Sequence, residues 1–189
     1  MAAAEPIRDK AQFRALADYF YQRGEFRNYA LIVVGTYTAL RISDLLNLRW
    51  TDVYDEGRGA FMEHINLTEK KTGKRKLIAL NDNAVKALSI YFPYRHGNYI
   101  FASKKSDKPI SRIQAWRIIR DAASAVGVSG NISCHSLRKT WGYHAWTSSN
   151  VSPVVIMDVY NHSDYNTTKR YLGITQNDLD RAYLDLEIL

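Results

Sequence analysis

One pair of β-prone runs interrupts a chain whose other periodic segments are helical. Residues 61–67 and 74–80 favour strands, and the dipeptide Thr72-Gly73 between them is a turn signal. The linking segment, residues 70–76, reads KKTGKRK and makes the expected hairpin strongly basic. The pattern predicts an α+β fold that is mainly helical, with a small antiparallel sheet and one β-hairpin.

The expected helices show apolar residues at helical spacing. Asp9 can cap the first helix and Gly24 can end it, and the apolar face between them comprises Phe13, Leu16, Ala17 and Phe20. A strongly apolar helix is predicted over residues 25–38 as buried core, and residues 39–50 have a second helical face. Further helices are predicted at 82–91, 111–126, 137–148, 153–160, 167–172 and 176–186.

Size and charge limit the possible classes of protein. A length of 189 residues favours one domain over residues 1–189. Twenty-six Lys and Arg against 19 Asp and Glu give a net charge of +7, which suggests a polyanionic partner. The single cysteine, Cys134, excludes an internal disulfide and a Cys-rich zinc site. Neither a signal peptide nor a membrane-spanning run is visible, so we expect a cytoplasmic protein without a membrane partner.

Two His-containing groups in the last third of the chain can carry chemistry. His135 and Arg138 are three residues apart and share one face if that segment is helical. His162 and Tyr171 are nine apart, so a straight helix would point them in opposite directions. They can converge only if the chain breaks near Asn161, as the polar residues there allow. Taken singly, each of these residues is more typical of a helix end or an aromatic core position.

Four segments of this chain, in order, resemble the sequence boxes of the tyrosine recombinases of the phage-integrase and Xer type. Residues 38–48 (TALRISDLLNL) resemble the first-arginine box, and residues 70–74 (KKTGK) the catalytic-lysine hairpin. Residues 135–140 (HSLRKT) resemble the His-x-x-Arg box. Residues 161–163 (NHS) followed by 170–173 (RYLG) resemble the closing box with its nucleophile. The resemblance covers essentially the whole chain.

The resemblance implies strand cleavage by Tyr171, which would form a 3′-phosphotyrosyl link and release a 5′-hydroxyl. Arg41 and Arg138 would hold the non-bridging phosphate oxygens, and His162 would hydrogen-bond one of them. His135 would accept the tyrosine proton, and Lys71, favoured over Lys70 by register, would protonate the leaving oxygen. Because the covalent link keeps the phosphodiester's energy, neither a cofactor nor a metal is expected.

Other basic residues are candidates for contacts with double-stranded DNA. The candidates are Lys70, Lys74, Lys104, Lys105, Arg112, Arg117 and Lys139, with Lys108 and Arg120 nearby. Such contacts give affinity that depends on salt and carries no sequence information. A solvated basic face is an equally good interpretation of any one of them. Trp116, Trp141 and Trp146 are expected in the core rather than stacked on bases.

The chain departs from the family pattern in two places. Tyr160-Asn161 stands where Leu-Gly is usual, and Asn tolerates the left-handed conformation that Gly supplies. About 25 residues precede the apolar core helix, so we expect no separate N-terminal core-binding domain, and an accessory DNA-binding protein could replace it. The amphipathic tail, residues 178–189, could dock on a neighbouring protomer in a DNA-bound homotetramer or on its own domain. The alternative functions are DNA relaxation of the type IB topoisomerase kind and an accessory DNA-binding role.

Overall fold

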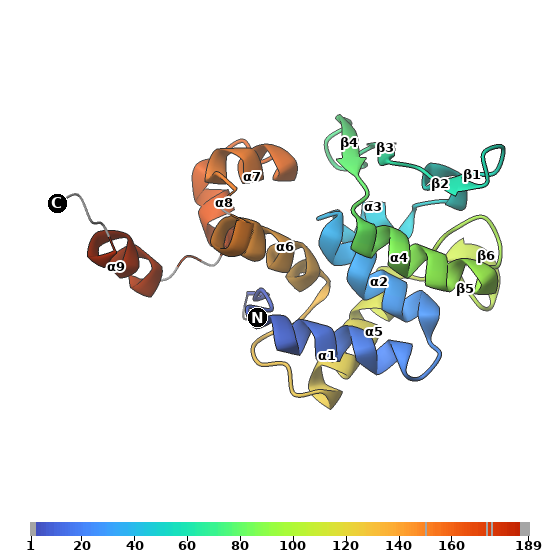
Figure 1. Cartoon of the computed structure of the whole chain (residues 1–189), viewed down its shortest axis with the longest axis horizontal. Coiled ribbons are helices and arrows are strands. Elements are labelled where there is room, and N and C mark those ends of the chain that lie inside the picture. The colour runs from blue at the N-terminus through green and yellow to red at the C-terminus, as the bar shows by residue number, and fades with distance from the viewer. Residues whose placement is uncertain (1–2, 150, 173, 175, 186–189) are drawn as a thin grey trace.

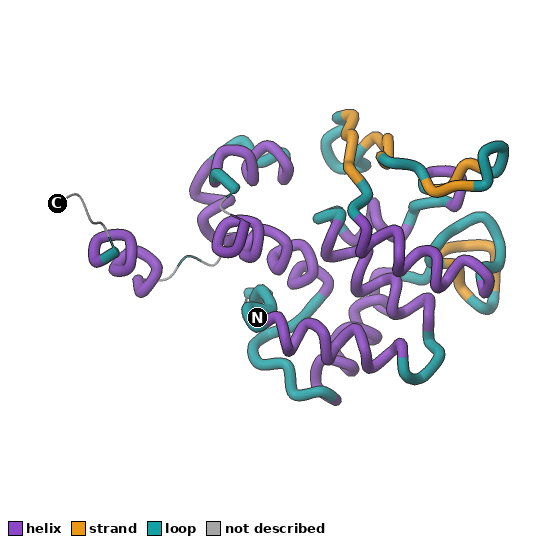
Figure 2. Tube along the Cα trace, viewed as in Figure 1, coloured by secondary structure: helices purple, strands orange, loops and turns teal. Residues whose placement is uncertain are grey.

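The structure is a computed structural model that describes residues 3–149, 151–172, 174 and 176–185. Two 3₁₀ turns, η1 (Trp50–Asp52) and η2 (Phe92–Tyr94), accompany the α-helices. The α-helices are α1 (Lys10–Tyr21), α2 (Phe26–Tyr37), α3 (Ile42–Leu46), α4 (Asp82–Tyr91), α5 (Arg112–Ala125), α6 (Cys134–Ser149), α7 (Pro153–Tyr160), α8 (Tyr165–Leu172) and α9 (Gln176–Leu184). The expected mainly helical α+β fold is confirmed (Figure 2).

The strands form three two-stranded antiparallel sheets in the described residues rather than the single sheet expected. The predicted hairpin is β3 (His64–Thr68) with β4 (Arg75–Ala79), in a register that pairs Thr68 with Arg75. The other pairs are β1 (Tyr54–Asp55) with β2 (Ala60–Phe61), and β5 (Ala102–Ser103) with β6 (Ser106–Pro109). Three of these strands have two residues, too few for a period-two pattern, and β6 consists of the four polar or turn-forming residues Ser106–Pro109, which show no apolar alternation.

The first helices are confirmed and build most of the core. The side chain of Asp9 accepts a hydrogen bond from the backbone of Ala11, and Gly24 has the positive φ that lets the chain turn after α1. Leu16 and Phe20 of α1 are buried, as are Leu31 and Val34 of α2. These side chains belong to a large apolar cluster that also receives residues from α3, α4 and α5.

A second, smaller apolar cluster joins α6, α7 and α8. Its buried members include Ala145 of α6, Ile156 and Tyr160 of α7, and Leu172 of α8. Helix α6 connects the two clusters, because Leu137 near its start packs in the large cluster and Ala145 in the small one. Figure 1 shows α6 running from the main body to α7 and α8. The candidate catalytic residues lie where these two clusters meet.

Helix α6 begins earlier than expected, and this affects the site. Helix α6 begins at Cys134 rather than Leu137, so His135 and Arg138 both lie on the helix. Helix α9 stands apart from the main body in Figure 1, and Leu179, Tyr183 and Leu184 on it are exposed. The end of the predicted amphipathic tail, residues 186–189, lies outside the described residues. In the described part of the chain, every helix is too short or too polar to cross a bilayer.

Candidate active site

Arg138 is a fully buried guanidinium at the meeting point of the two clusters. It lies one turn into α6 and is 1% exposed. One terminal nitrogen, Nη1, donates to the carbonyl of Ala39, and Nη2 donates to the carbonyl of Tyr160 at 2.8 Å. Its guanidinium carbon also lies 4.4 Å from the centre of the Tyr160 ring. Burial, and then the charge of Arg41, lower the pKa of Arg138, and these carbonyl and ring contacts are what hold it in place.

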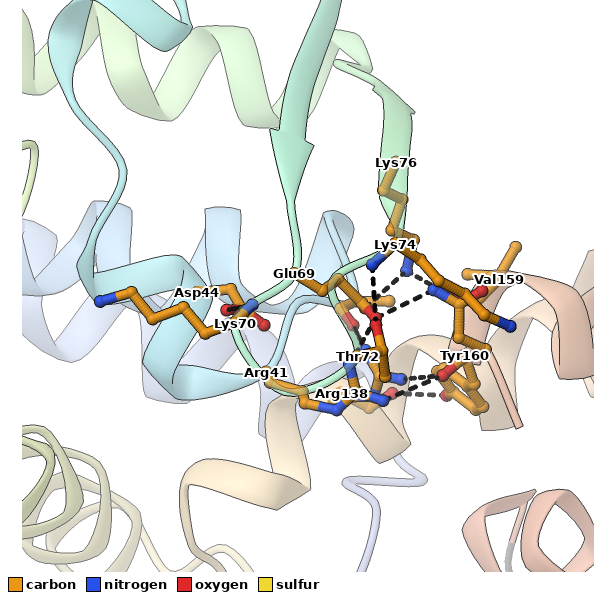
Figure 3. A network of polar contacts seen from close by, with 12 residues as sticks. Arg41, Asp44, Glu69, Lys70, Thr72, Lys74, Lys76, Arg138, Val159 and Tyr160 are labelled. Carbon is orange, nitrogen blue, oxygen red and sulfur yellow. Dashed lines mark hydrogen bonds and ion pairs between the residues drawn. The ribbon is translucent and has the colours of Figure 1, made fainter. Parts of the chain in front are cut away.

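Arg41 approaches the same carbonyl from the other side. It is the N-cap residue of α3, just after the turn that ends α2. Its Nη2 donates to the Tyr160 carbonyl at 3.4 Å, and its Nη1 lies 2.7 Å from Oε2 of Glu69. Figure 3 shows both guanidinium groups directed at Tyr160. The two predicted phosphate-binding arginines are therefore neighbours, as the resemblance requires.

Glu69 is a buried carboxylate at the base of the β3–β4 turn. Besides Arg41, its Oε2 accepts hydrogen bonds from Thr72 Oγ1 at 2.8 Å and from Asn161 Nδ2 at 2.9 Å. Burial alone would oppose ionisation, but the hydrogen bonds from Arg41, Asn161 and Thr72 outweigh it and lower the pKa of Glu69 to about 2. The site thus holds a permanent anion that the sequence analysis did not predict.

Lys76 is the hairpin lysine that points into the site. Its Nζ donates to the carbonyl of Val159 and lies 3.6 Å from Oε1 of Glu69, and its side chain is 11% exposed. Burial, and then the positive charge of Arg138, lower the pKa of Lys76 to about 8, although Glu69 opposes the shift. Lys71, by contrast, is exposed on the turn.

His162 and Tyr171 converge because the chain breaks between them, as predicted. Helix α7 ends at Tyr160, Asn161 adopts the left-handed conformation with φ 52°, and α8 begins at Tyr165. The His162 and Tyr171 rings meet edge to face with centroids 4.8 Å apart. Lys139 Nζ also lies 5.3 Å from the centre of the Tyr171 ring.

Both histidines of the site favour the neutral form. Burial, and then the charges of Arg138 and Arg41, lower the pKa of His162 to about 4, and its Nδ1 lies 3.0 Å from Thr168 Oγ1. Burial also lowers the pKa of His135, helped by Arg138, Lys139, Arg41 and Lys71. A neutral imidazole at neutral pH can accept a proton, which is what the role predicted for His135 requires.

Three of the basic residues near the site line one groove. Lys70, Lys108 and Arg112 share it with the residues at the end of α3. Lys104 and Lys105 are exposed at the turn of the β5–β6 hairpin, Lys74 on the β3–β4 turn, and Arg117 on α5. Lys70, Lys108 and Arg112 therefore form a basic groove, while the other candidates are spread over separate exposed surfaces.

The tryptophans were predicted to be core residues, and this is wrong for Trp116. Its side chain is 38% exposed on α5, with the Arg120 guanidinium carbon 4.3 Å from its ring centre. Trp141 and Trp146 pack against the smaller apolar cluster.

A sequence model of the phage integrase family matches residues 9–178. A probable integrase/recombinase of Bacillus subtilis, YoeC, is 35% identical over 184 residues, which is 97% of each chain. The tyrosine recombinase XerD of Mycobacterium tuberculosis is 27% identical over 83% of this chain, and the match spans 51% of that relative. FimE, a type 1 fimbriae regulatory protein of Escherichia coli, is 30% identical over 77% of this chain and 73% of its own length.

Solved structures show the same fold. The crystal structure of XerA recombinase superposes with a TM-score of 0.76 at 22% identity, covering 98% of this chain and 65% of that one. A post-cleavage complex of XerH recombinase with a palindromic difH substrate gives a TM-score of 0.75 at 16% identity, covering 97% of this chain and 53% of that one. The match over residues 9–178 and the likeness to YoeC along nearly the whole of both chains establish that this protein belongs to the phage integrase family.

Proposed function

We propose that this protein is a site-specific DNA recombinase that breaks and rejoins strands through Tyr171. The observation that carries the proposal is the contact of Tyr171 with His162 beside the paired guanidinium groups of Arg41 and Arg138. The names of its relatives, an integrase/recombinase and a tyrosine recombinase, support the same reaction.

In the proposed reaction the oxygen of Tyr171 attacks the scissile phosphorus. The bond from phosphorus to the 5′-oxygen breaks, leaving a 3′-phosphotyrosyl link, and His135 takes the phenolic proton while Lys71 gives one to the departing oxygen. The 5′-hydroxyl of a partner strand then attacks the link, frees Tyr171 and restores the phosphodiester. Arg41 and Arg138 stabilise the charge on the non-bridging oxygens in both steps, and removal of one such donor typically costs about 100- to 1000-fold.

Metal independence follows from this division of roles. Two guanidinium groups supply the positive charge that a divalent cation supplies in other phosphoryl-transfer sites. His162, neutral at pH 7, adds a hydrogen bond to a phosphate oxygen. Because the phosphotyrosyl bond keeps the energy of the broken phosphodiester, rejoining needs no nucleotide cofactor.

The experiment uses a nicked suicide duplex drawn from the sequence flanking the gene, incubated with protein in EDTA and run on a denaturing gel. A covalent adduct on the 3′ side of the break is expected with the wild type and absent with Tyr171→Phe. Tyr165→Phe, on an exposed tyrosine of the same helix, is the matched control and should form the adduct. Adduct formation by Tyr171→Phe would refute the assignment of Tyr171 as the nucleophile. DNA binding by the wild type without any adduct would favour an accessory DNA-binding role.

The partner is double-stranded DNA, bound through the basic groove. Lys70, Lys108 and Arg112 lie together there, so one stretch of phosphate backbone can contact all three. We also propose that an accessory DNA-binding protein takes part in the reaction, and that the reaction takes place in the cytoplasm.

We also propose that the active assembly is a homotetramer on DNA held together by α9. Leu179 is 39% exposed, and Tyr183 and Leu184 are 83% and 80% exposed. An exposed apolar helix face of this kind favours burial against a second copy of the chain.

A further inference from the structure

Two carboxylates tie the β3–β4 turn, which carries Lys71, to the rest of the site. Asp44 of α3 accepts a hydrogen bond from the backbone N–H of Lys70 at 3.1 Å, and Glu69 makes the remaining contacts. The backbone N–H of Glu69 donates to the carbonyl of Lys74 at 3.0 Å, and the N–H of Gly73 donates to the carbonyl of Glu69 at 2.9 Å. The Thr72 hydroxyl closes the same turn from inside by donating to the Glu69 carboxylate at 2.8 Å. Lys71 therefore stands between Lys70, whose N–H is held by Asp44, and Thr72, whose hydroxyl is held by Glu69.

The same carboxylate reaches outward to the two other parts of the site. It pairs with Arg41 at 2.7 Å on the segment between α2 and α3. It accepts a hydrogen bond at 2.9 Å from Asn161, which precedes His162. Figure 3 shows Glu69 at the centre of this network, with Arg41, Thr72 and Lys76 around it. Segments far apart in sequence are thus joined by one buried anion.

We propose that Glu69 is a positioning residue for strand cleavage, whose carboxylate fixes the Lys71 turn relative to Arg41. This inference rests on the proposed recombinase function. The alternative is that Glu69 merely occupies the phosphate site in the absence of DNA. For that role, contacts with the cations Arg41 and Lys76 would be sufficient. The additional hydrogen bonds from Thr72 and Asn161 indicate a positioning role, because they fix the β3–β4 turn and the segment before His162 rather than the arginine and lysine side chains.

The cleavage test compares an ordinary suicide duplex with one whose scissile 5′-bridging oxygen is replaced by sulfur. A thiolate leaves without a proton, since a thiol has a pKa about 8.5, so the second substrate does not depend on a general acid. Glu69→Gln keeps the shape but removes the charge, and should slow cleavage of the ordinary duplex by about 10- to 100-fold. The deficit should shrink on the sulfur substrate, while DNA affinity measured by titration stays within about threefold.

Two further variants keep the test interpretable. Glu63→Gln makes the same chemical change at an exposed position just before β3, and should cleave both substrates as the wild type does. Glu69→Asp keeps the charge with a shorter reach, and should give a smaller deficit than Glu69→Gln. Faster cleavage by Glu69→Gln, or an equal deficit on both substrates, would overturn the proposal.

A measurement without DNA separates this inference from the proposed function. Amide hydrogen exchange of residues 70–74 should speed up in Glu69→Gln, while exchange in α1 and α2 stays at the wild-type rate. Unchanged hydrogen exchange in residues 70–74 would contradict the positioning role of Glu69 even if the protein cleaves DNA. If Glu69→Gln speeds exchange in the turn but the wild type forms no adduct on any flanking duplex, only the recombinase function would be contradicted.

Discussion

A methyl group at Gly142 would clash with Tyr160, the residue whose carbonyl accepts hydrogen bonds from both Arg41 and Arg138. Gly142 is buried on α6, one turn after Arg138. A Cβ there would lie 2.1 Å from the Tyr160 hydroxyl oxygen, 2.9 Å from Cζ and 3.2 Å from Cε2. That ring is fully buried, and its hydroxyl donates to the carbonyl of Arg138 at 2.7 Å. Gly142→Ala must therefore displace Tyr160, whose own carbonyl accepts from Arg41 and Arg138.

The size of the effect follows from three contributions. Overpacking a filled core typically costs about 1–3 kcal/mol. Loss of the Tyr160 hydrogen bond costs about 0.5–1.5 kcal/mol. Alanine regains about 1 kcal/mol of helix propensity over glycine. The net expectation is a loss of about 0.5–3.5 kcal/mol in the free energy of unfolding. Each kcal/mol lost lowers Tm by about 2–4 °C in a domain of this size.

Thermal and urea unfolding of Gly142→Ala, Tyr160→Phe and the double variant test this reasoning. Tyr160→Phe removes the oxygen nearest to the new methyl group, so the two substitutions should destabilise the protein by less together than the sum of their separate effects. Ser124→Ala, on an exposed turn of α5, controls for helix propensity alone. A Gly142→Ala protein as stable as the wild type, or strictly additive substitutions, would refute the predicted contact. The covalent adduct should also fall in Gly142→Ala, because the shared carbonyl moves.

Three further outcomes are expected. The pKa of His162, about 4, lies below the ordinary 6.5. Between about pH 4 and 6.5 the unfolded chain therefore binds more protons than the folded protein, so the free energy of unfolding should fall as pH drops through this range. Urea titrations at pH 7 and 5 should show that His162→Gln lacks this part of the pH dependence. Combined Lys70→Ala and Arg112→Ala substitutions should reduce the salt slope of DNA binding by about 0.9 for each lost phosphate contact, and an unchanged slope would remove the basic groove from the interface. Leu179→Ser with Tyr183→Ser should leave DNA binding intact but abolish tetramers in sedimentation of the DNA complex, and tetramers at the wild-type level would contradict docking through α9.

Local signals in the sequence were sufficient for most helices and for the break before the nucleophile. Helices α4 and α7 have the predicted bounds, because Asn81 and Ser152 cap their first turns. The predicted break near Asn161 is confirmed: Asn161 adopts the left-handed conformation that its side chain tolerates, and His162 meets Tyr171. These features depend on residues within one or two turns of each other, so they can be read without knowledge of the fold.

The interior of the site could not be predicted in the same way. Glu69 contacts Asn161 across 92 positions of sequence, and no local pattern indicates such a partner. Lys76 stood among several hairpin lysines, although alternation along β4 places it with Ile78 on the less exposed face. Alternation separates Lys76 from Lys71 and Arg75, whereas Lys74 has the same parity and differs only in preceding the strand. Ala39 adopts a left-handed conformation with φ 51°, for which an alanine gives no warning.

The unusual backbone at Ala39 and Asn161 has a common effect on the charge balance of the site. A left-handed residue other than glycine costs about 1–2 kcal/mol, yet Ala39 in that conformation directs its carbonyl at Arg138. The second carbonyl on Arg138 comes from Tyr160, directly before left-handed Asn161.

Arg138 is thus held by backbone dipoles and an aromatic ring rather than by a carboxylate, while Glu69 pairs with Arg41 and Lys76. Arg41, Lys76 and Arg138 are three cations beside the one carboxylate of Glu69, so these four side chains retain net positive charge for a phosphate. A second carboxylate on Arg138 would have removed that charge. Dipoles hold the guanidinium in position without cancelling its attraction for the scissile phosphate.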